Sequence, residues 1–114
     1  MKRVLVCGGR DYNDSLRVIA VLDRVHRLRT ISCVIHGNAK GADTCAALWA
    51  EMRSVDALAF PAQWDLYGKR AGFLRNTQML DEGLPDAVIA FPGGVGTAMM
   101  VKISEDRGIP VMRP

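Results

Sequence analysis

One stretch of this chain combines residue types that can hold an anion: Pro92, Gly93, Gly94, Val95, Gly96 and Thr97. An apolar, β-branched segment at 86–91 precedes it and is typical of a buried strand, while residues 98–104 have the composition of a helix. Glycines at a strand-to-helix turn let backbone N–H groups approach a phosphate closely, and the helix start adds unpaired donors and a positive dipole end. The stretch therefore predicts a phosphate-binding loop, in which Thr97 either caps the helix or donates its hydroxyl.

Two further glycine-rich segments follow apolar segments in the first half of the chain. They supply these candidate ligand contacts: Gly8, Gly9, Arg10, Asp11, Gly37, Asn38, Lys40, Gly41 and Asp43. The guanidinium of Arg10 can fork onto a phosphate or carboxylate, or it can pair in solvent with Asp11 or Asp14. Lys40 can add a point charge to the same anion. Asp43 stands where a side chain would cap the following helix, with ligand contact as the alternative.

A polar and aromatic segment at 64–72 leads into the third expected helix. Within it, Trp64 can stack on a base or pack beside Pro61. Arg75 and Asn76 fall near the start of the helix, where an arginine opposes the helix dipole at a cost of roughly a few tenths of a kcal/mol. Because such local conflicts occur at functional sites, we expect Trp64, Arg75 and Asn76 to contact the ligand.

The chain lacks a recognisable catalytic constellation. It contains no G-x-x-x-x-G-K-[ST] motif, so Walker-type ATP hydrolysis is not expected. The loop at 93–96 lacks the third glycine of a dinucleotide fingerprint, and the second strand ends in His36 rather than in the acid that contacts a ribose. No nucleophile elbow, His–Asp pair or carboxylate cluster stands out. We therefore predict no catalytic residue, cofactor or metal.

Composition and charge agree with one ordinary globular domain. Of the 114 residues, 49% are hydrophobic and 24% are charged, and the net charge of +3 comes from Lys and Arg spread along the chain. Cys7, Cys33 and Cys45 have no metal-binding spacing, which favours free thiols in a reducing cytoplasm. The N-terminal residues lead directly into a strand, and no apolar run approaches membrane-spanning length. We therefore expect a cytoplasmic protein without a signal peptide or membrane contact.

Strand and helix patterns alternate along the whole chain. The expected strands are 3–7, 32–36, 57–60, 86–91 and 109–112. The expected helices run from a cap at Asp14 or Ser15 to 28, from the second glycine-rich loop to about 53, over 71–82 and over 97–107. Gly83 and Pro85 are expected to stop the third helix, and Gly108 to cap the fourth.

Alternation of this kind implies right-handed crossovers and a parallel sheet. We predict an α/β fold: a single Rossmann-like domain over residues 1–114, with an open parallel sheet of about five strands in the order 3-2-1-4-5 and helices on both faces. Such a sheet binds ligands at the carboxyl ends of its strands, where the strand order reverses. The three glycine-rich loops should then meet at one edge of the sheet, beside the first and fourth strands.

Several segments together resemble the small YspA-like, YpsA-related branch of the SLOG superfamily. They are 4–12, 36–43, 60–64, 75–76 and 91–97, in that order along nearly the whole chain. The resemblance implies a Rossmann-like domain that binds nucleotides or nucleotide-derived molecules, and it implies dimers or higher homo-oligomers. An excess of apolar residues at 99–101 on the fourth helix also favours self-association.

Two better-known relatives suggest other functions. The phosphoribohydrolases of the Lonely guy (lysine-decarboxylase-like) type carry P-G-G-x-G-T-x-x-E and cleave the N-glycosidic bond of nucleoside monophosphates with that Glu and an Arg. This chain resembles them at 92–97, and Arg75 with Met79 resembles their R-x-x-x-M pattern. However, Met100 stands at the position of the Glu and cannot transfer a proton. The DNA-processing protein A family has a loop similar to 37–43 and binds single-stranded DNA.

The combined pattern favours binding of a nucleotide-derived molecule that contains phosphate or pyrophosphate, such as a nucleoside monophosphate or an ADP-ribose derivative. Binding would serve sensing or sequestration. The first alternative is a phosphoribohydrolase-like enzyme that uses an acid such as Asp11 or Asp43. The second is single-stranded nucleic-acid binding, for which only Trp64, Lys69 and Arg70 suggest a basic and aromatic track.

Overall fold

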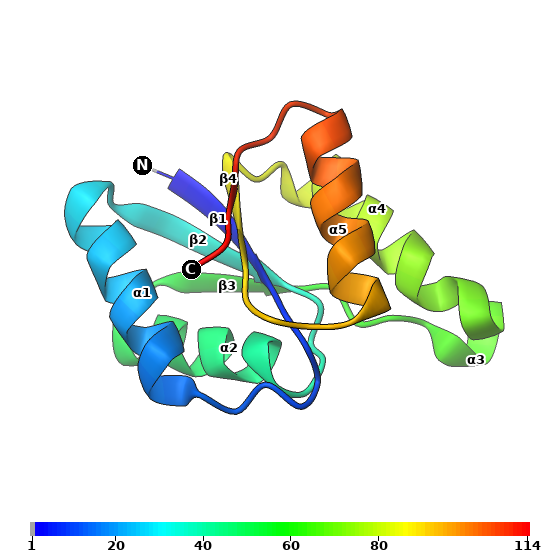
Figure 1. The fold of residues 1–114 in the computed structure, drawn as a ribbon, viewed down its shortest axis with the longest axis horizontal. Coiled ribbons are helices and arrows are strands. Elements are labelled where there is room, and N and C mark those ends of the chain that lie inside the picture. The colour runs from blue at the N-terminus through cyan, green and yellow to red at the C-terminus, as the bar shows by residue number, and fades with distance from the viewer. Residues whose placement is uncertain (1) are drawn as a thin grey trace.

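The computed structural model describes residues 2–114 as one sheet with helices on both faces (Figure 1). The strands are β1 (Lys2–Cys7), β2 (Ile31–His36), β3 (Asp56–Ala59), β4 (Ala87–Ala90) and β5 (Val111–Met112). The helices are α1 (Ser15–Leu28), α2 (Ala42–Met52), α3 (Trp64–Tyr67), the 3-10 helix η1 (Gly68–Arg70), α4 (Ala71–Gly83) and α5 (Val95–Asp106). All strands are parallel, in the order β3-β2-β1-β4-β5. The predicted fold class and strand order are confirmed.

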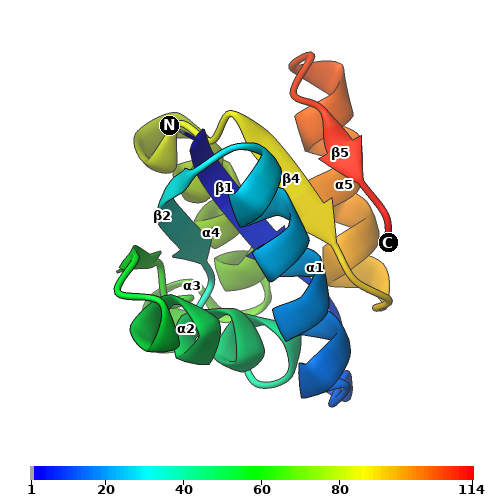
Figure 2. The ribbon, with the colours of Figure 1, turned by 90° about the vertical axis from the view of Figure 1, so that its left-hand side faces the viewer.

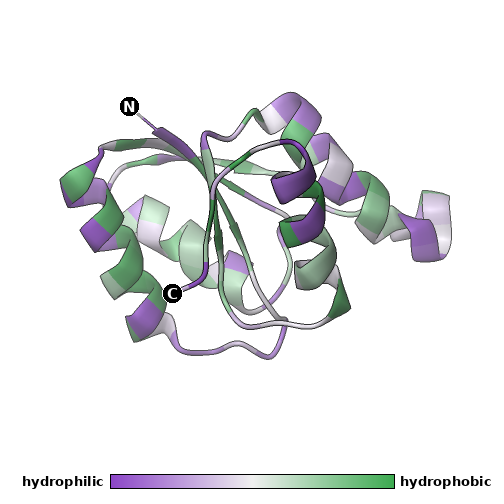
Figure 3. Cartoon of the chain, turned by 45° about the horizontal axis from the view of Figure 1, so that its top comes forward, coloured by the Kyte–Doolittle hydropathy of each residue, from purple (hydrophilic) through white to green (hydrophobic). Residues whose placement is uncertain are grey.

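The central strand β1 is apolar on both of its faces. Val4 and Val6 pack in the core formed with α1 and α2, whereas Leu5 packs in the core formed with α4 and α5. Successive side chains of a strand point to opposite faces, so one strand serves both cores. Figure 2 shows the two helix pairs on opposite sides of the sheet, and Figure 3 shows hydrophobic residues concentrated on the strands and on helix surfaces turned toward them.

The helix ends confirm two predicted signals and correct a third. Asp14 caps α1, since its Oδ1 accepts a hydrogen bond from the Arg17 N–H at 3.1 Å. Gly108, with φ of 74°, follows the end of α5 as expected. The prediction that Gly83 stops the third helix is wrong. Gly83 is helical and packs closely against Ile35, and Leu84 takes the left-handed conformation instead, with φ of 51°.

Two helices differ from the sequence expectation near the predicted site. The segment before α4, expected to be a loop, contains the one-turn helix α3 and η1. Helix α5 begins at Val95, two residues before the predicted start, so Thr97 lies inside its first turn and does not cap it. All four residues of the edge strand β3 are exposed, although Leu58 is only 37% exposed.

The apolar residues at 99–101 on α5 face the inside of a single chain. Met100 and Val101 are buried in the core with α4, and Met99 lines a cavity. Self-association therefore stays a prediction that rests on the family resemblance. Cys7, Cys33 and Cys45 are free thiols, and residues 2–114 contain no cluster of His, Cys, Asp or Glu suited to a metal. Over the same range, no helix has both the length and the apolar character to cross a bilayer.

Candidate functional site

The three glycine-rich loops meet at the carboxyl edge of the sheet, where β1 and β4 are neighbours. The Gly9 N–H donates to the Pro92 carbonyl at 2.9 Å, which joins the loop after β1 to the loop after β4. The Ala42 N–H donates to the Gly9 carbonyl at 3.4 Å, which joins the loop after β2 to the same point. The convergence predicted from the strand order is therefore confirmed at the level of loop contacts.

The glycines in these loops have two different uses. Gly41 has φ of 81° and lies against the backbone of Gly9, so a side chain there would be both strained and obstructed. A Cβ at Gly93 would lie 2.6 Å from the Gly9 nitrogen. In contrast, a Cβ at Gly94 or Gly96 would meet no atom within 4 Å. The first two glycines hold the loops together, and the last two leave open space.

That open space belongs to a cavity of about 510 Å³, which we call the main cleft. The predicted site residues that line it are Gly8, Gly9, Arg10, Asp43, Trp64, Arg75, Asn76, Gly94, Gly96 and Thr97. Its volume falls within the range of small-molecule sites, roughly 300–1,000 Å³. Gly41 lines none of the cavities described here, and Pro92 and Gly93 face a separate hollow behind the loop. These three residues thus build the framework of the site and do not line the main cleft.

The N-terminus of α5 opens directly into the main cleft. Gly94 precedes the helix, and Val95, Gly96 and Thr97 form its first turn. The first helical hydrogen bond runs from the Ala98 N–H to the Gly94 carbonyl at 3.0 Å, so the three N–H groups before Ala98 have no partner within the helix. No side chain of the described residues caps this end. The helix start therefore offers unpaired donors and a positive dipole end to the cleft.

Two guanidinium groups face the same cleft without a carboxylate partner at ion-pair distance in residues 2–114. Arg10 lies over the Trp64 ring, 5.7 Å from its centroid. Arg75 donates from Nη1 to the Gly37 carbonyl at 2.6 Å and from Nε to Asn76 Oδ1 at 3.0 Å. Burial lowers the pKa of Arg75, nearby Asp43 opposes that shift, and the positive charge of Arg10 adds to it. The two arginines are therefore close enough to repel each other.

Asp43 is 6% exposed and does not cap α2, which corrects the sequence expectation. Its Oδ2 accepts hydrogen bonds from the N–H groups of Gly37 at 2.9 Å and Ala39 at 3.2 Å, so the carboxylate holds the preceding loop. Burial raises the pKa of Asp43, while those two hydrogen bonds and Arg75 oppose the rise. The other carboxylate oxygen, Oδ1, has no hydrogen-bond partner in the described residues and is not buried, so it is accessible from the main cleft.

Two other polar residues support the loops. Asn76 is 5% exposed, and its Nδ2 donates to the Gly96 carbonyl at 3.4 Å, so it links α4 to the start of α5 and orients Arg75. His36 is buried, and its Nδ1 accepts a hydrogen bond from the Asn38 N–H at 3.0 Å. Burial lowers the pKa of His36, which keeps the imidazole neutral and able to accept that bond.

A second cavity of about 540 Å³, the side cavity, adjoins the main cleft. The remaining predicted residues lie here: Asp11, Gly37, Asn38 and Lys40. The two cavities share four residues: Arg10, Ala39, Trp64 and Arg75. The stacked Arg10–Trp64 pair, together with Arg75, therefore forms the boundary between them.

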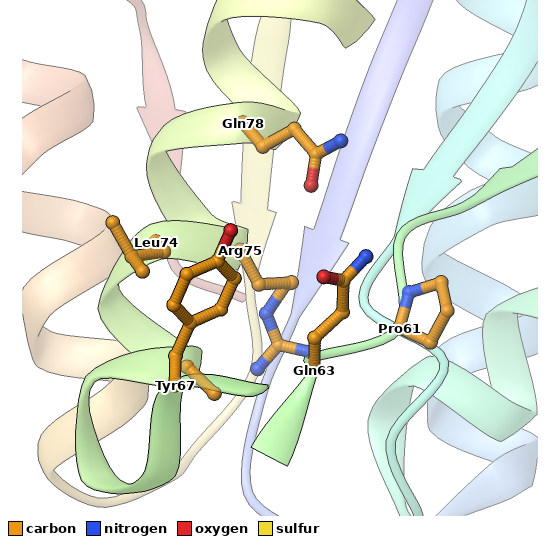
Figure 4. A pocket seen from close by; sticks show the side chains of 7 residues that line it. Pro61, Gln63, Tyr67, Leu74, Arg75 and Gln78 are labelled. Atoms are coloured by element: carbon orange, nitrogen blue, oxygen red, sulfur yellow. The ribbon is translucent and has the colours of Figure 1, made fainter. Parts of the chain in front are cut away.

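A smaller pocket of about 230 Å³ lies on the far side of Arg75 (Figure 4). Figure 4 shows Tyr67, Gln63 and Pro61 around the Arg75 side chain. Tyr67 lines this pocket and not the main cleft, so it is not placed to cover a base there. Arg75 contacts all three cavities and is the common element of the site.

Apolar and sulfur-containing residues complete the main cleft and were not predicted as ligand contacts. They are Cys7, Phe73, Met79, Met99 and Met100. Cys7 is the last residue of β1, Phe73 and Met79 belong to α4, and Met99 and Met100 belong to α5. Only Met79 carried a signal in the sequence, because it follows Arg75 by four residues and so lies on the same side of the helix. Burial raises the pKa of the Cys7 thiol to about 12, with a smaller contribution from Asp43. Cys7 is therefore a neutral wall residue and not a nucleophile.

A family model described as YspA, cpYpsA-related SLOG matches residues 2–67, which is more than half of the chain. The chain belongs to this SLOG family. The family match covers β1 to α3 and includes Arg10, Asp43 and Trp64. The chain is also 39% identical to the Gene 61 protein of Mycobacterium phage D29 over 120 residues, which cover 98% of this chain and 95% of that protein. That second likeness extends over α4 and α5, which complete the main cleft.

Proposed function

We propose that this SLOG protein binds a nucleotide-derived small molecule through its phosphate groups, for sensing or sequestration. The observation that carries the proposal is the uncapped N-terminus of α5, which faces the same cleft as the guanidinium groups of Arg10 and Arg75. A phosphate there would accept hydrogen bonds from the first N–H groups of the helix and would relieve the repulsion between the two arginines.

The charge lining the main cleft favours an anion. Arg10, Lys69 and Arg75 contribute three positive charges, and Asp43 is the one acidic side chain among the described lining residues. Three donors of the Arg75 guanidinium remain after its two hydrogen bonds, which suits a phosphate. Family membership is consistent with nucleotide-related binding and supports the same conclusion.

The size and lining of the cavities favour a ligand larger than phosphate. Trp64 and Phe73 are each 48% exposed and border the main cleft, where an aromatic base could pack on them. Because the side cavity begins at the same two arginines, a pyrophosphate held by Arg10 and Arg75 could carry one group into each cavity. An ADP-ribose derivative fits this description better than a simple nucleoside monophosphate.

Native mass spectrometry of the purified protein, followed by thermal-shift measurements, tests the proposal. AMP, GMP and ADP-ribose are suitable probes, with unphosphorylated adenosine as the control. A ligand at 100 times its dissociation constant should stabilise the fold by about 2.7 kcal/mol. The proposed function is wrong if mass spectrometry detects no co-purified nucleotide and no phosphorylated probe raises the melting temperature.

Hydrolysis of an N-glycosidic bond is a second candidate, because Asp43 places a carboxyl group with a raised pKa in the main cleft. In that reaction Asp43 would donate its proton to the departing base while water adds to the ribose carbon. Met100, which is 1% exposed, supplies no acid. Incubation with AMP and ADP-ribose, followed by chromatography, would reveal free adenine. Asp43→Asn keeps an acceptor for the loop but cannot transfer the proton, so it should abolish turnover and retain binding if this candidate is right.

A further inference from the structure

A second candidate binding surface lies away from the main cleft, in an apolar groove between α1 and β5. Its volume is about 490 Å³. Val21, Val25 and Met112 contribute apolar surface to it, and Arg17, Arg24 and Arg27 stand along it. Met112 is 46% exposed although it belongs to a strand, because its side chain points to the α1 side of the sheet while Val111 packs toward α5. We call this surface the arginine groove.

The three arginines of the groove are exposed and lie on one side of α1. Positions 17, 24 and 27 are spaced by about two turns and one turn, so their side chains form a row. None of them has a carboxylate within ion-pair distance in residues 2–114, and no Asp or Glu side chain lines the groove. The nearby Asp23 is engaged by Arg53, through two hydrogen bonds at 2.9 Å, and by the indole of Trp49.

The sheet carries no helix over β5 on this side in the part of the chain that is described. Figure 2 shows β5 uncovered beside α1, with α5 behind it. The opposite face of the sheet carries both α4 and α5. The groove therefore lies where one more helix could pack alongside α1, and the segment from Arg17 to Leu28 would support about 16 Å of it, or roughly three turns.

We propose that the arginine groove binds an amphipathic helix of a partner protein, with its apolar stripe in the groove and its Asp or Glu side chains paired with Arg17, Arg24 and Arg27. Charge complementarity selects this occupant. A second copy of this chain would bring the same row of arginines against itself, because a two-fold interface uses one surface twice. A single-stranded nucleic acid would need aromatic stacking surfaces, and the groove has an aliphatic lining.

Nuclear magnetic resonance titration tests the proposal with a synthetic helical peptide of about 18 residues, or five turns, made of Glu, Ala and a leucine stripe. The expected result is saturable shifts of the backbone amides of α1 and of Met112, weakened by added salt. Arg24→Glu should reduce peptide affinity at least about ten-fold, because it replaces an attraction with a repulsion. Arg29→Glu makes the same charge change just beyond α1 and outside the groove, and it should change affinity less than about two-fold.

Four results would overturn the proposal. Absence of saturable shifts is one, and equal binding of a peptide with the same composition but no leucine stripe is another. Shifts confined to the main cleft would assign the peptide to a different site. If sedimentation experiments show that the protein dimerises and that Arg24→Glu changes the dimerisation, the groove binds a second copy of this chain. Circular dichroism spectra matching the wild type establish that both variants are folded.

Discussion

Arg75 is the residue on which most of the site depends, because it contacts all three cavities and ties α4 to the loop after β2. Arg75→Ala removes the hydrogen bond to the Gly37 carbonyl and should destabilise the fold by about 1 kcal/mol. It should also remove a charge-assisted phosphate contact and weaken ADP-ribose binding by at least about ten-fold. Calorimetry and urea unfolding measure the two effects. The matched control is Arg70→Ala, because Arg70 lines none of these cavities. Loss of stability in Arg75→Ala with ADP-ribose affinity unchanged from the wild type would show that Arg75 is only structural.

Asp43 organises the loop after β2 through two backbone hydrogen bonds. Asp43→Ala leaves the Gly37 and Ala39 N–H groups without this acceptor and should reduce the free energy of unfolding by about 1–3 kcal/mol. Asp11→Ala removes an exposed carboxylate from the neighbouring loop and should change stability by less than about 0.5 kcal/mol. Urea unfolding at neutral pH compares the two variants. Equal stability of both would show that Asp43 does not hold the loop.

His36 should make the stability of the fold depend on pH. Its pKa is lowered from 6.5 by burial, so the unfolded chain binds a proton more readily than the folded one. The stabilising contribution is therefore complete above pH 6.5 and is lost as the pH falls through the lower folded value. Urea unfolding between pH 7.5 and 5 should show a smaller loss for His36→Gln than for the wild type. Parallel pH profiles would contradict this assignment.

Among the helices, α5 begins with a residue of low helix propensity, Gly96 in its first turn, next to the open space of the main cleft. Gly96→Ala should stabilise the fold by about 0.5–1 kcal/mol, because glycine is a weaker helix former than alanine and the new Cβ meets no atom within 4 Å. The same methyl group enters the main cleft and should weaken ADP-ribose binding. Gly93→Ala should instead destabilise the fold, because its Cβ would lie 2.6 Å from the Gly9 nitrogen. Thermal unfolding and calorimetry separate the two outcomes; unchanged affinity in Gly96→Ala would exclude the helix start from the site.

The sequence predicts the main helices and strands, but not the role of each residue at their ends. Alternating apolar strands and helices determined the strand order, since right-handed crossovers allow few arrangements. The sequence shows a glycine at both 93 and 94, so it does not reveal that Gly93 packs against another loop while Gly94 faces open space. An aspartate at a helix start, such as Asp43, is most often a cap, and the sequence therefore predicts one, whereas in the structure Gly41 occupies the cap position. Helix α3 was missed because its four residues are too few to show periodicity.

At the scale of the whole molecule, the cleft is assembled from both halves of the chain. Arg10 and Asp43 come from the part matched by the family model, whereas Arg75 and the α5 start come from the part beyond it. The predicted topological switch between β1 and β4 brings them together, so the general location of the site was accessible from sequence. The division into a main cleft and a side cavity was not, because it depends on the packing of Arg10 over Trp64.

A nuclear magnetic resonance titration of the isotope-labelled protein with ADP-ribose tests most directly whether the start of α5 holds a phosphate. We expect the largest shifts at the backbone amides of Val95, Gly96 and Thr97 and at the side-chain N–H groups of Arg10 and Arg75. Adenosine without phosphate should leave the Val95 to Thr97 amides essentially unshifted. Shifts at other surfaces, with the resonances at the start of α5 unchanged, would show that this helix end does not hold the phosphate.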